Sequence, residues 1–414
     1  MKVLFVHQNM PGQYREFASW LGAKGTHEIV FLTQRRNSPK IGGVRTVQYA
    51  PHHKPAQDAF GLSKVWEEAT GAGFGAASAA RKLDDEGFRP DIIIVHTGWG
   101  EMLFLKQIWP DVPILGLFEY FYRATGGPVG FDPEEPVNAH APFLLEARNA
   151  VPYAALHQVD RGIVPTQWQH DRFPPGFQDK LHVLHDGIRT DQLLPDPDVR
   201  LRLGRLEHHV SRDDEIITYI ARNMERTRGF HQFMQALPKI LNARPNARVI
   251  AIGGSETSYG KASDHPGGLR GEMEAEVGHL IDWSRVHFVG RVPYPEFCKI
   301  IQVSRCHIYL TMPFVLSWSM MEAMAMQATI VAADVAPVQE VMTHGKTGLL
   351  VDFFDPDALA AQVAEVLENP QAYAHLGPAA RNHVVENYDF LTKSLPGLVD
   401  HINALVPPDK AITL

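Results

Sequence analysis

Short apolar runs alternate with longer amphipathic stretches along the first half of this chain. The strand-like runs lie at residues 3–7, 27–33, 91–96, 113–118, 162–165 and 181–184. Several are apolar throughout, which is typical of parallel strands that are covered on both faces. After the first run, Tyr14, Phe17, Ala18 and Leu21 recur at the spacing of one helix face. This alternation predicts an α/β fold with a doubly wound, mainly parallel sheet.

The alternation weakens after residue 187 and restarts near residue 214. The intervening stretch holds Pro195, Pro197 and a cluster of aspartates. The strand-like runs that follow lie at residues 215–221, 248–252, 286–289, 306–310, 329–333 and 348–351. A helix face is predicted from the spacing of Phe230, Phe233, Met234 and Leu237. We therefore predict two Rossmann-like domains, residues 1–190 and residues 191–385, joined near residues 187–212.

Charge and composition exclude several classes of protein. The formal net charge is −8, which argues against non-specific binding of nucleic acid. Cys298 and Cys306 are too few for a disulfide scaffold or a four-thiolate zinc site. No apolar run is long enough to span a bilayer, and the apolar start is too short for a signal peptide. We expect a cytoplasmic protein, and the weak basic patch of Arg35, Arg36 and Lys40 leaves contact with the inner membrane face open.

Three arginines follow the first strand of the second half. Because ligands of parallel sheets bind outside the carboxyl ends of strands, residues at such ends deserve most weight. Arg222, Arg226 and Arg228 lie just before or at the start of a helix, where further positive charge is unfavourable. A bound anion would relieve that charge, and helix N-termini favour phosphate. The alternative is surface pairing with Glu225 or nearby acids, and we favour the anion site.

A very apolar helix is predicted to start near Ser319, and it contains Glu322. A carboxylate in a buried helix is costly without a partner. One interpretation is a capping box, Ser319-x-x-Glu322, in which the carboxylate accepts from local backbone N–H groups. The other is that Glu322 accepts hydrogen bonds from ligand hydroxyls while N–H groups near Ser319 meet a phosphate. Both interpretations stay open, and they can coexist.

These blocks resemble the second domain of retaining GT-B glycosyltransferases of family 4. That family has G-R-x₄-K-G, glycine-rich strand-end turns and P-S-x-x-E-x₇-E-A-M-A-x-G-x-P-V-V. The segments that resemble these blocks are residues 221–229, 250–254, 286–290, 312–333, 337–341 and 345–351, within a stretch of roughly residues 180–370. Three positions depart from the family pattern. Arg228 replaces the Lys with one extra residue of spacing, Phe314 stands at the first Glu, and Gln327 stands at the Gly.

The resemblance implies a GT-B architecture, in which two Rossmann-like domains face each other across a cleft. It implies a nucleotide-sugar donor on the second domain, an acceptor on the first, and a C-terminal helix within residues 386–414 that packs back on the first domain. Arg222 and Arg228 would bind the donor diphosphate, and Glu322 the ribose. The other implied donor-binding residues are Gly12, Gly254, Arg291, Val292, Ser317, Trp318, Ser319 and Met320.

His96 ends a buried strand of the first domain and precedes two glycines. A lone histidine is more often structural than catalytic. The resemblance, however, places this histidine next to the transferred sugar. Glu119, at the next strand end, is the nearest candidate carboxylate, and its aromatic neighbours form either an acceptor wall or, as we favour, core. The candidate catalytic residues are His96, Glu119, Arg222 and Arg228.

The resemblance thus implies a glycosyltransferase that moves a sugar from a UDP- or GDP-sugar to a carbohydrate, lipid-linked or small acceptor. We expect retention of configuration, no cofactor and no metal, since the D-x-D-like stretches 196–198 and 355–357 contain Pro and are typical of turns or helix starts. Two alternatives remain. Phe314 motivates a non-catalytic nucleotide-sugar-binding protein of the same fold, and a nucleotide-sugar 2-epimerase shares the architecture. The base, the sugar, the acceptor and the oligomeric state are not predicted.

Overall fold

The structure, a computed structural model, describes residues 1–203 and 209–414. The chain forms two units. Unit 1 comprises Met1–Thr125, Pro136–Gly187 and Phe390–Leu414, and unit 2 comprises Gly126–Glu135 and Ile188–Asp389. The predicted junction near residues 187–212 includes the boundary at Gly187, and its residues 204–208 lie outside the described part of the chain. The predicted domain ranges did not include the excursion of Gly126–Glu135 into unit 2.

Every residue of unit 1 is described, and its sheet has seven parallel strands in the order β3-β2-β1-β4-β5-β6-β7. The strands are β1 (Lys2–Val6), β2 (Glu28–Thr33), β3 (Val44–Gln48), β4 (Ile92–His96), β5 (Ile114–Leu117), β6 (Arg161–Val164) and β7 (Leu181–Val183). The six predicted strands are confirmed. The prediction missed β3, because this edge strand is partly exposed along its whole length and has no apolar run.

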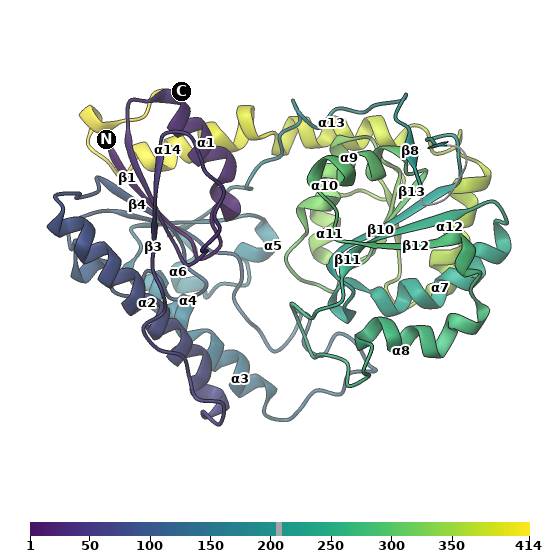
Figure 1. Ribbon diagram of the computed structural model, residues 1–414, viewed down its shortest axis with the longest axis horizontal. Coiled ribbons are helices and arrows are strands. Elements are labelled where there is room, and N and C mark those ends of the chain that lie inside the picture. Colours follow the sequence, from purple (N-terminus) through teal and green to yellow (C-terminus); the bar gives the residue numbers. More distant parts are fainter. Residues whose placement is uncertain (204–208) are drawn as a thin grey trace. The chain divides into compact units, whose positions relative to one another are not determined.

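Helices cover both faces of this sheet. Alternate residues of its strands point to opposite faces, so each strand contributes to both layers of the core. Val3 and Phe5 pack with Phe17 of α1 (Arg15–Lys24) and with Ile402 of α14 (Leu395–Asn403). Figure 1 shows α14 beside α1 on this face. The opposite face of the sheet is covered by α2 (Gly61–Asp85) and α4 (Ala150–Gln158). The other α-helices of unit 1 are α3 (Ala141–Arg148), α5 (Gln167–His170) and α6 (Pro175–Gln178).

Within its described residues, unit 2 has a six-stranded parallel sheet in the order β12-β11-β10-β13-β14-β15. These strands are β10 (Ile216–Asn223), β11 (Arg248–Gly254), β12 (Val286–Gly290), β13 (Cys306–Tyr309), β14 (Ile330–Ala333) and β15 (Leu349–Val351). All six were predicted. A separate antiparallel pair joins β8 (Leu201–Arg202) to β9 (His209–Val210).

The helices of unit 2 also lie on both faces of their sheet (Figure 1). One face carries α7 and α12, and the other carries α9 and α10. The bounds are α7 (Phe230–Ala243), α8 (Gly268–Val277), α9 (Tyr294–Val303), α10 (Trp318–Ala325), α11 (Ala336–Val341), α12 (Pro356–Glu368) and α13 (Leu376–Tyr388). Phe230, Phe233, Met234 and Leu237 are fully buried, which confirms the predicted helix face. A helix of sufficient length and apolarity to cross a bilayer does not occur among the described residues.

Each sheet has one point where the strand order reverses direction. In unit 1 the chain runs outward from β1 through β2 and β3, and then continues at β4 on the other side of β1. In unit 2 it runs outward from β10 and continues at β13. The loops that leave such a strand pair diverge and open a crevice, which is where ligands of this fold bind. The ends of β1, β4, β10 and β13 are therefore the places to look for chemistry.

Candidate functional site

The turn after β10 lies against the loop after β13. It contains a short 3₁₀ helix, η3 (Arg226–Arg228), followed by Gly229 at φ +64°. A side chain at Gly229 would collide with Leu310, so this position needs glycine for the close approach as well as for its left-handed backbone. The N–H of Met312 donates to the carbonyl of Thr227 at 2.9 Å. The two loops at the switch point of unit 2 are thereby joined.

Arg228 lies in this turn with its side chain directed into the protein, and the residue is only 7% exposed. Its Nη1 donates to Oγ1 of Thr311 at 2.9 Å and to the carbonyl of Val315 at 3.0 Å. Its guanidinium carbon is 5.8 Å from the ring centres of both Tyr259 and Phe314. Within the described part of the chain, no carboxylate forms an ion pair with Arg228. Because a buried cation without a counter-ion is unfavourable, this arrangement favours a bound anion.

The other two arginines of this stretch behave differently from Arg228. Arg222 is exposed at the end of β10, and no carboxylate among the described residues pairs with it. Arg226 instead lies 3.3 Å from Asp132 and 3.2 Å from Glu134. Of the two interpretations from the sequence, pairing with nearby acids thus describes Arg226, although one of these acids, Asp132, is buried. Among the described residues it does not describe Arg222 or Arg228.

Residues at the ends of β10, β11 and β12 surround the predicted Gly254. Arg291 donates from Nη2 to Oδ1 of Asn223 at 2.8 Å and pairs with Glu256 at 2.5 Å. A side chain at Gly254 would collide with all three of these groups. The structure therefore brings Gly254 and Arg291 together, with the half-buried Val292 next in the chain.

Glu225 was not predicted as a site residue, although it orders the loop that carries Tyr259. The residue is 3% exposed, and its Oε2 accepts from the N–H groups of Ser258 at 2.8 Å and Tyr259 at 2.9 Å. Burial raises the pKa of this carboxyl above its ordinary value, against the opposing effect of these hydrogen bonds. The chain neighbours of Glu225 contain no pattern that indicates this contact.

Of the two interpretations of Ser319 and Glu322 at the start of α10, the capping box is wrong. The helix begins at Trp318 with Ser317 as its N-cap, and no side-chain capping bond is formed there. Ser319 therefore lies inside the first turn, where a capping-box serine does not belong. Glu322 accepts a hydrogen bond from the Tyr294 hydroxyl at 2.7 Å. The N–H of Ser317 donates to the Tyr309 hydroxyl at 2.9 Å, so this amide is already used within unit 2.

Two histidines lie at the switch point of unit 1, each fixed in one tautomer. The Nδ1 atom of His96 accepts from the Gly98 N–H at 3.2 Å, and that of His7 accepts from the Asn9 N–H at 2.9 Å. In the neutral rings the hydrogen is therefore on Nε2. Both residues are 2% exposed, and Trp99 stacks on the His96 ring at a centroid distance of 3.9 Å. The orientation of both imidazoles is thus set by the fold.

A line of polar side chains joins the two histidines through Glu119. His7 Nε2 lies 2.8 Å from Oε1 of Gln13, whose amide nitrogen donates to Oε1 of Glu119. The other carboxylate oxygen of Glu119 lies 3.1 Å from Nε2 of His96, although not in the direction of a good hydrogen bond. The structure therefore brings together the two predicted residues His96 and Glu119, and it adds His7 and Gln13.

The charge states in this line follow from its surroundings. Burial, with a smaller effect from His96, lowers the pKa of His7 to about 3, so this ring is neutral near pH 7. Burial opposes ionisation of Glu119, but His96, His7 and Gln13 outweigh it and hold the pKa of this carboxyl below its ordinary value. The line thus consists of a neutral imidazole, an amide, a carboxylate and a second imidazole, an arrangement that can position or accept a proton.

Gly12 is the glycine of the loop that covers His7. Its φ is +50°, and an added Cβ would collide with the His7 ring. The structure therefore places Gly12 against the imidazole, next to Gln13. The rule that selected His96, a polar residue at the carboxyl end of a buried strand, would also have selected His7. Gln13 and Trp99 lie in loops, where no periodic signal identifies them.

The aromatic residues next to Glu119 divide between the two interpretations. Phe118 and Phe121 are 1% and 3% exposed and belong to the core. Tyr120 and Tyr122 are half-buried, and their rings contact each other at 5.1 Å. The two phenylalanines are therefore core residues, as we favoured from the sequence, whereas the two tyrosines are not.

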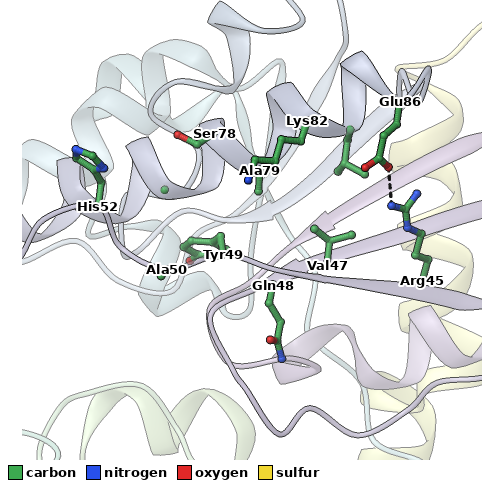
Figure 2. Close-up of a pocket in the computed structure, with 12 residues that line it drawn as sticks. Arg45, Val47, Gln48, Tyr49, Ala50, His52, Ser78, Ala79, Lys82 and Glu86 are labelled. Carbon is green, nitrogen blue, oxygen red and sulfur yellow. Dashed lines mark hydrogen bonds and ion pairs between the residues drawn. The ribbon is translucent and has the colours of Figure 1, made fainter.

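A cavity of about 300 Å³ lies elsewhere in unit 1, between the edge strand β3 and α2. Figure 2 shows its lining, with Arg45 and Glu86 joined by an ion pair of 2.7 Å at one end and His52 at the other. It contains none of the predicted site residues. The candidate site is therefore the pair of switch points rather than this cavity.

The sequence matches two family descriptions, one in each half. Residues 25–193 match "Glycosyl transferase family 4 group" and residues 206–383 match "Glycosyl transferases group 1". The chain belongs to family 4 of the glycosyltransferases. This family assignment and the two parallel sheets confirm the resemblance and the GT-B architecture expected from the sequence.

Curated relatives carry transferase and synthase names. The chain is 25% identical over 233 residues to a GDP-mannose-dependent α-(1-6)-phosphatidylinositol monomannoside mannosyltransferase of Mycolicibacterium smegmatis, covering 55% of this chain and 58% of the relative. It is 24% identical over 423 residues to a glycogen synthase of Mycobacterium tuberculosis, covering 95% and 92%. The chain spans about half the length of several other curated relatives that it matches.

Solved structures share the fold over nearly the whole chain. Sucrose-phosphate synthase from Thermosynechococcus elongatus has a TM-score of 0.72 at 17% identity, covering 98% of this chain and 99% of that one. HepE of Anabaena, in complex with UDP and glucose, has a TM-score of 0.70 at 14% identity, covering 98% and 100%. At these identities the likeness establishes the fold alone.

Proposed function

We propose that this protein transfers a glycosyl group from a nucleoside-diphosphate sugar to an acceptor. The observation that carries the proposal is Arg228, a nearly buried guanidinium at the switch point of unit 2, with no carboxylate partner among the described residues. A diphosphate is an anion of the right charge for such a group, because a guanidinium binds phosphate oxygens through two parallel N–H donors. Family membership supports the same assignment.

Departure of the nucleoside diphosphate builds negative charge on its phosphate oxygens, and this charge needs stabilisation. Arg228 is already held by Thr311 and Val315, so it needs little reorganisation to meet this charge. Arg222 supplies a second, exposed cation, and the N-terminal turn of α10 supplies a positive dipole end. In this proposal these groups stabilise the leaving group without a metal ion, and the reaction retains the anomeric configuration.

On the acceptor side we assign the chemistry to the line through Glu119 in unit 1. In the proposed reaction the departing phosphate oxygen takes the acceptor proton while His96 assists. Glu119 lies 3.1 Å from the ring nitrogen of His96 that bears hydrogen, so its charge holds the neutral imidazole in this tautomer and orientation. Gln13 keeps the carboxylate in place from the other side.

The substrate classes follow from the same reasoning. We propose a UDP- or GDP-sugar as donor, which is consistent with the GDP-mannose named for one relative and the UDP bound in one neighbour. We propose a carbohydrate or lipid-linked acceptor in the cytoplasm. Cys298 and Cys306 are both free thiols, as in proteins of a reducing compartment.

The test is to incubate the protein with radiolabelled UDP- and GDP-sugars, with and without small and lipid-linked acceptors. We expect nucleotide release with one donor, faster with acceptor, and its loss in Arg228→Met, which keeps an apolar chain of similar length. Nucleotide binding without turnover of any donor would support a non-catalytic binding protein instead. Interconversion of the free nucleotide sugar without transfer would support an epimerase.

A further inference from the structure

The segment Gly126–Glu135 belongs to unit 2, whereas the chain on both sides of it belongs to unit 1. The chain therefore crosses between the units at four places rather than two, at residues 125/126, 135/136, 187/188 and 389/390. A segment this short cannot fold by itself, so its position in unit 2 must come from the contacts that it makes there.

An aromatic contact holds the middle of this segment. The ring of Phe131 lies 5.3 Å from the ring of Phe353 and 4.9 Å from that of Phe354, just after β15. Ring pairs at such distances stabilise a contact beyond the area that they bury. Phe131 therefore anchors the segment on the sheet end of unit 2.

The next residue, Asp132, has a side chain that is 1% exposed, although all four residues after it are charged or proline. Its Oδ2 lies 3.3 Å from Nη1 of Arg226 and 3.3 Å from Nε2 of His231, whose side chain is also 1% exposed. Its Oδ1 accepts from the N–H of Glu134 at 2.9 Å. His231 and, to a smaller extent, Arg226 hold the pKa of Asp132 below its ordinary value. Asp132 is thus a buried carboxylate with partners on both oxygens.

The groups that Asp132 contacts belong to the turn that carries Arg228. Arg226 opens η3, Arg228 closes it, and His231 is the second residue of the following helix α7. On its other side this turn is joined to the loop after β13 by the Met312–Thr227 hydrogen bond. The turn is therefore held from two sides, by the body of unit 2 and by the segment.

The segment also separates the roles of the two arginines in η3. Arg226 is surrounded by four carboxylates, from Asp132, Glu134 and Glu135 of the segment and from Glu272 at 3.6 Å. Arg228, two residues on, has no such partner among the described residues. The acids of the segment thus compensate the charge of Arg226, and the charge of Arg228 is left for a ligand.

We propose that Asp132 is a positioning residue for the donor: by docking Gly126–Glu135 on Arg226 and His231, it holds the η3 turn so that Arg228 meets the diphosphate. This proposal rests on the proposed function, because it assumes that Arg228 binds a nucleoside diphosphate. Asp132 itself touches no ligand in this scheme and acts through Arg226 and the turn.

The test compares Asp132→Asn with Glu272→Gln in the full-length chain. Each variant removes one carboxylate from Arg226, but only Asp132 lies in the segment. With UDP and GDP as titrants in calorimetry, we expect Asp132→Asn to weaken binding about tenfold and Glu272→Gln to leave it within about twofold. In steady-state assays the KM for the donor should rise by the same factor, while kcat changes little. Hydrogen exchange of the peptide that contains residues 126–135 reports whether the segment is docked.

A second variant, Phe131→Ser, removes the aromatic anchor without touching any charge. We expect it to speed hydrogen exchange in the segment and to weaken nucleotide binding as Asp132→Asn does. Unchanged affinity in a variant whose segment exchanges freely would overturn the proposal. An equal loss of affinity in Glu272→Gln would also overturn it, because the effect would then come from the charge around Arg226 alone. If the wild-type protein bound neither UDP nor GDP, the proposed function would fail, and this proposal with it.

Discussion

In unit 1 the strand ends around the switch point carry histidines and a glutamate, whereas in unit 2 they carry arginines. His7 and His96 lie at the ends of β1 and β4, which flank the reversal of strand order, and Glu119 follows the neighbouring strand β5. The arginines lie at the end of β10 and in the turn that follows it, and β10 is one of the two strands that flank the reversal in unit 2. In unit 1 the polar groups satisfy one another, through the line from His7 to His96. In unit 2 Arg228 is held by neutral oxygens, and no carboxylate among the described residues forms an ion pair with it. The topology therefore sets where a site lies, and the side chains decide whether it presents a proton-handling group or a cation.

The largest effect should come from removing the uncompensated cation. We expect Arg228→Met to lower kcat/KM for the donor on the order of a hundredfold, since loss of one preorganised donor costs about 3 kcal/mol of transition-state stabilisation. The free energy of unfolding should not fall, because a buried cation without a counter-ion contributes little stability. Steady-state kinetics measure kcat/KM, and urea unfolding measures the free energy of unfolding.

Arg244→Ala is the matched control, since Arg244 pairs with Glu215 at 2.5 Å in another part of unit 2. The Arg244→Ala variant should keep the wild-type rate of glycosyl transfer. A stability loss in Arg228→Met larger than that in Arg244→Ala would contradict the distinction between a ligand-binding and a structural arginine.

Removing the charge of Glu119 in unit 1 should lower turnover and leave donor binding unchanged. We expect Glu119→Gln to reduce kcat by about tenfold or more, because the amide keeps the shape but loses the charge that holds His96 in its tautomer and orientation. The affinity for UDP or GDP, measured by calorimetry, should stay the same. A parallel loss of nucleotide affinity would show that the two units do not divide the chemistry as proposed.

Gly12→Ala tests how tightly the loop in unit 1 is packed on His7. The added Cβ would collide with the imidazole and would also occupy a left-handed backbone. We expect a loss of roughly 2–3 kcal/mol in the free energy of unfolding. Gly25→Ala is the control, because its φ is +65° but nothing lies within 4 Å of the new atom, so only about 1 kcal/mol should be lost. Equal losses in urea unfolding would show that the contact with His7 is loose.

The last effect concerns pH and is smallest near neutral pH. Because the pKa of His7 falls to about 3 on folding, the unfolded chain takes up a proton below its ordinary pKa and the folded protein does not. Stability should therefore decrease as the pH falls from that ordinary value towards 3, with His7 contributing at most about 1.4 kcal/mol per pH unit. His7→Gln should have a shallower decrease in urea unfolding measured at several pH values. An unchanged slope would show that His7 protonates in the folded state.

Much of the fold followed from the sequence, because strands buried on both faces have apolar runs. The strand of Val44–Gln48 did not, since an edge strand faces water and lacks that run. The capping box at Ser319 failed for a related reason: a four-residue motif does not specify where a helix starts, and the Tyr309 hydroxyl that binds the Ser317 amide comes from a neighbouring strand. Tyr294, the partner of Glu322, is 28 residues distant in the sequence.

The sequence by itself determined the two parallel sheets and placed His96, Glu119, Arg222 and Arg228 at or just after the ends of strands. Periodicity and strand order suffice for this, because both are local properties of the chain. Only the tertiary structure decided that, among the described residues, carboxylates form ion pairs with Arg226 and none does with Arg228, and that His7 and Gln13 contact one another and Glu119. These outcomes depend on partners up to about a hundred residues away, such as Asp132 for Arg226, and the pairing of distant charges has no signature in the local sequence.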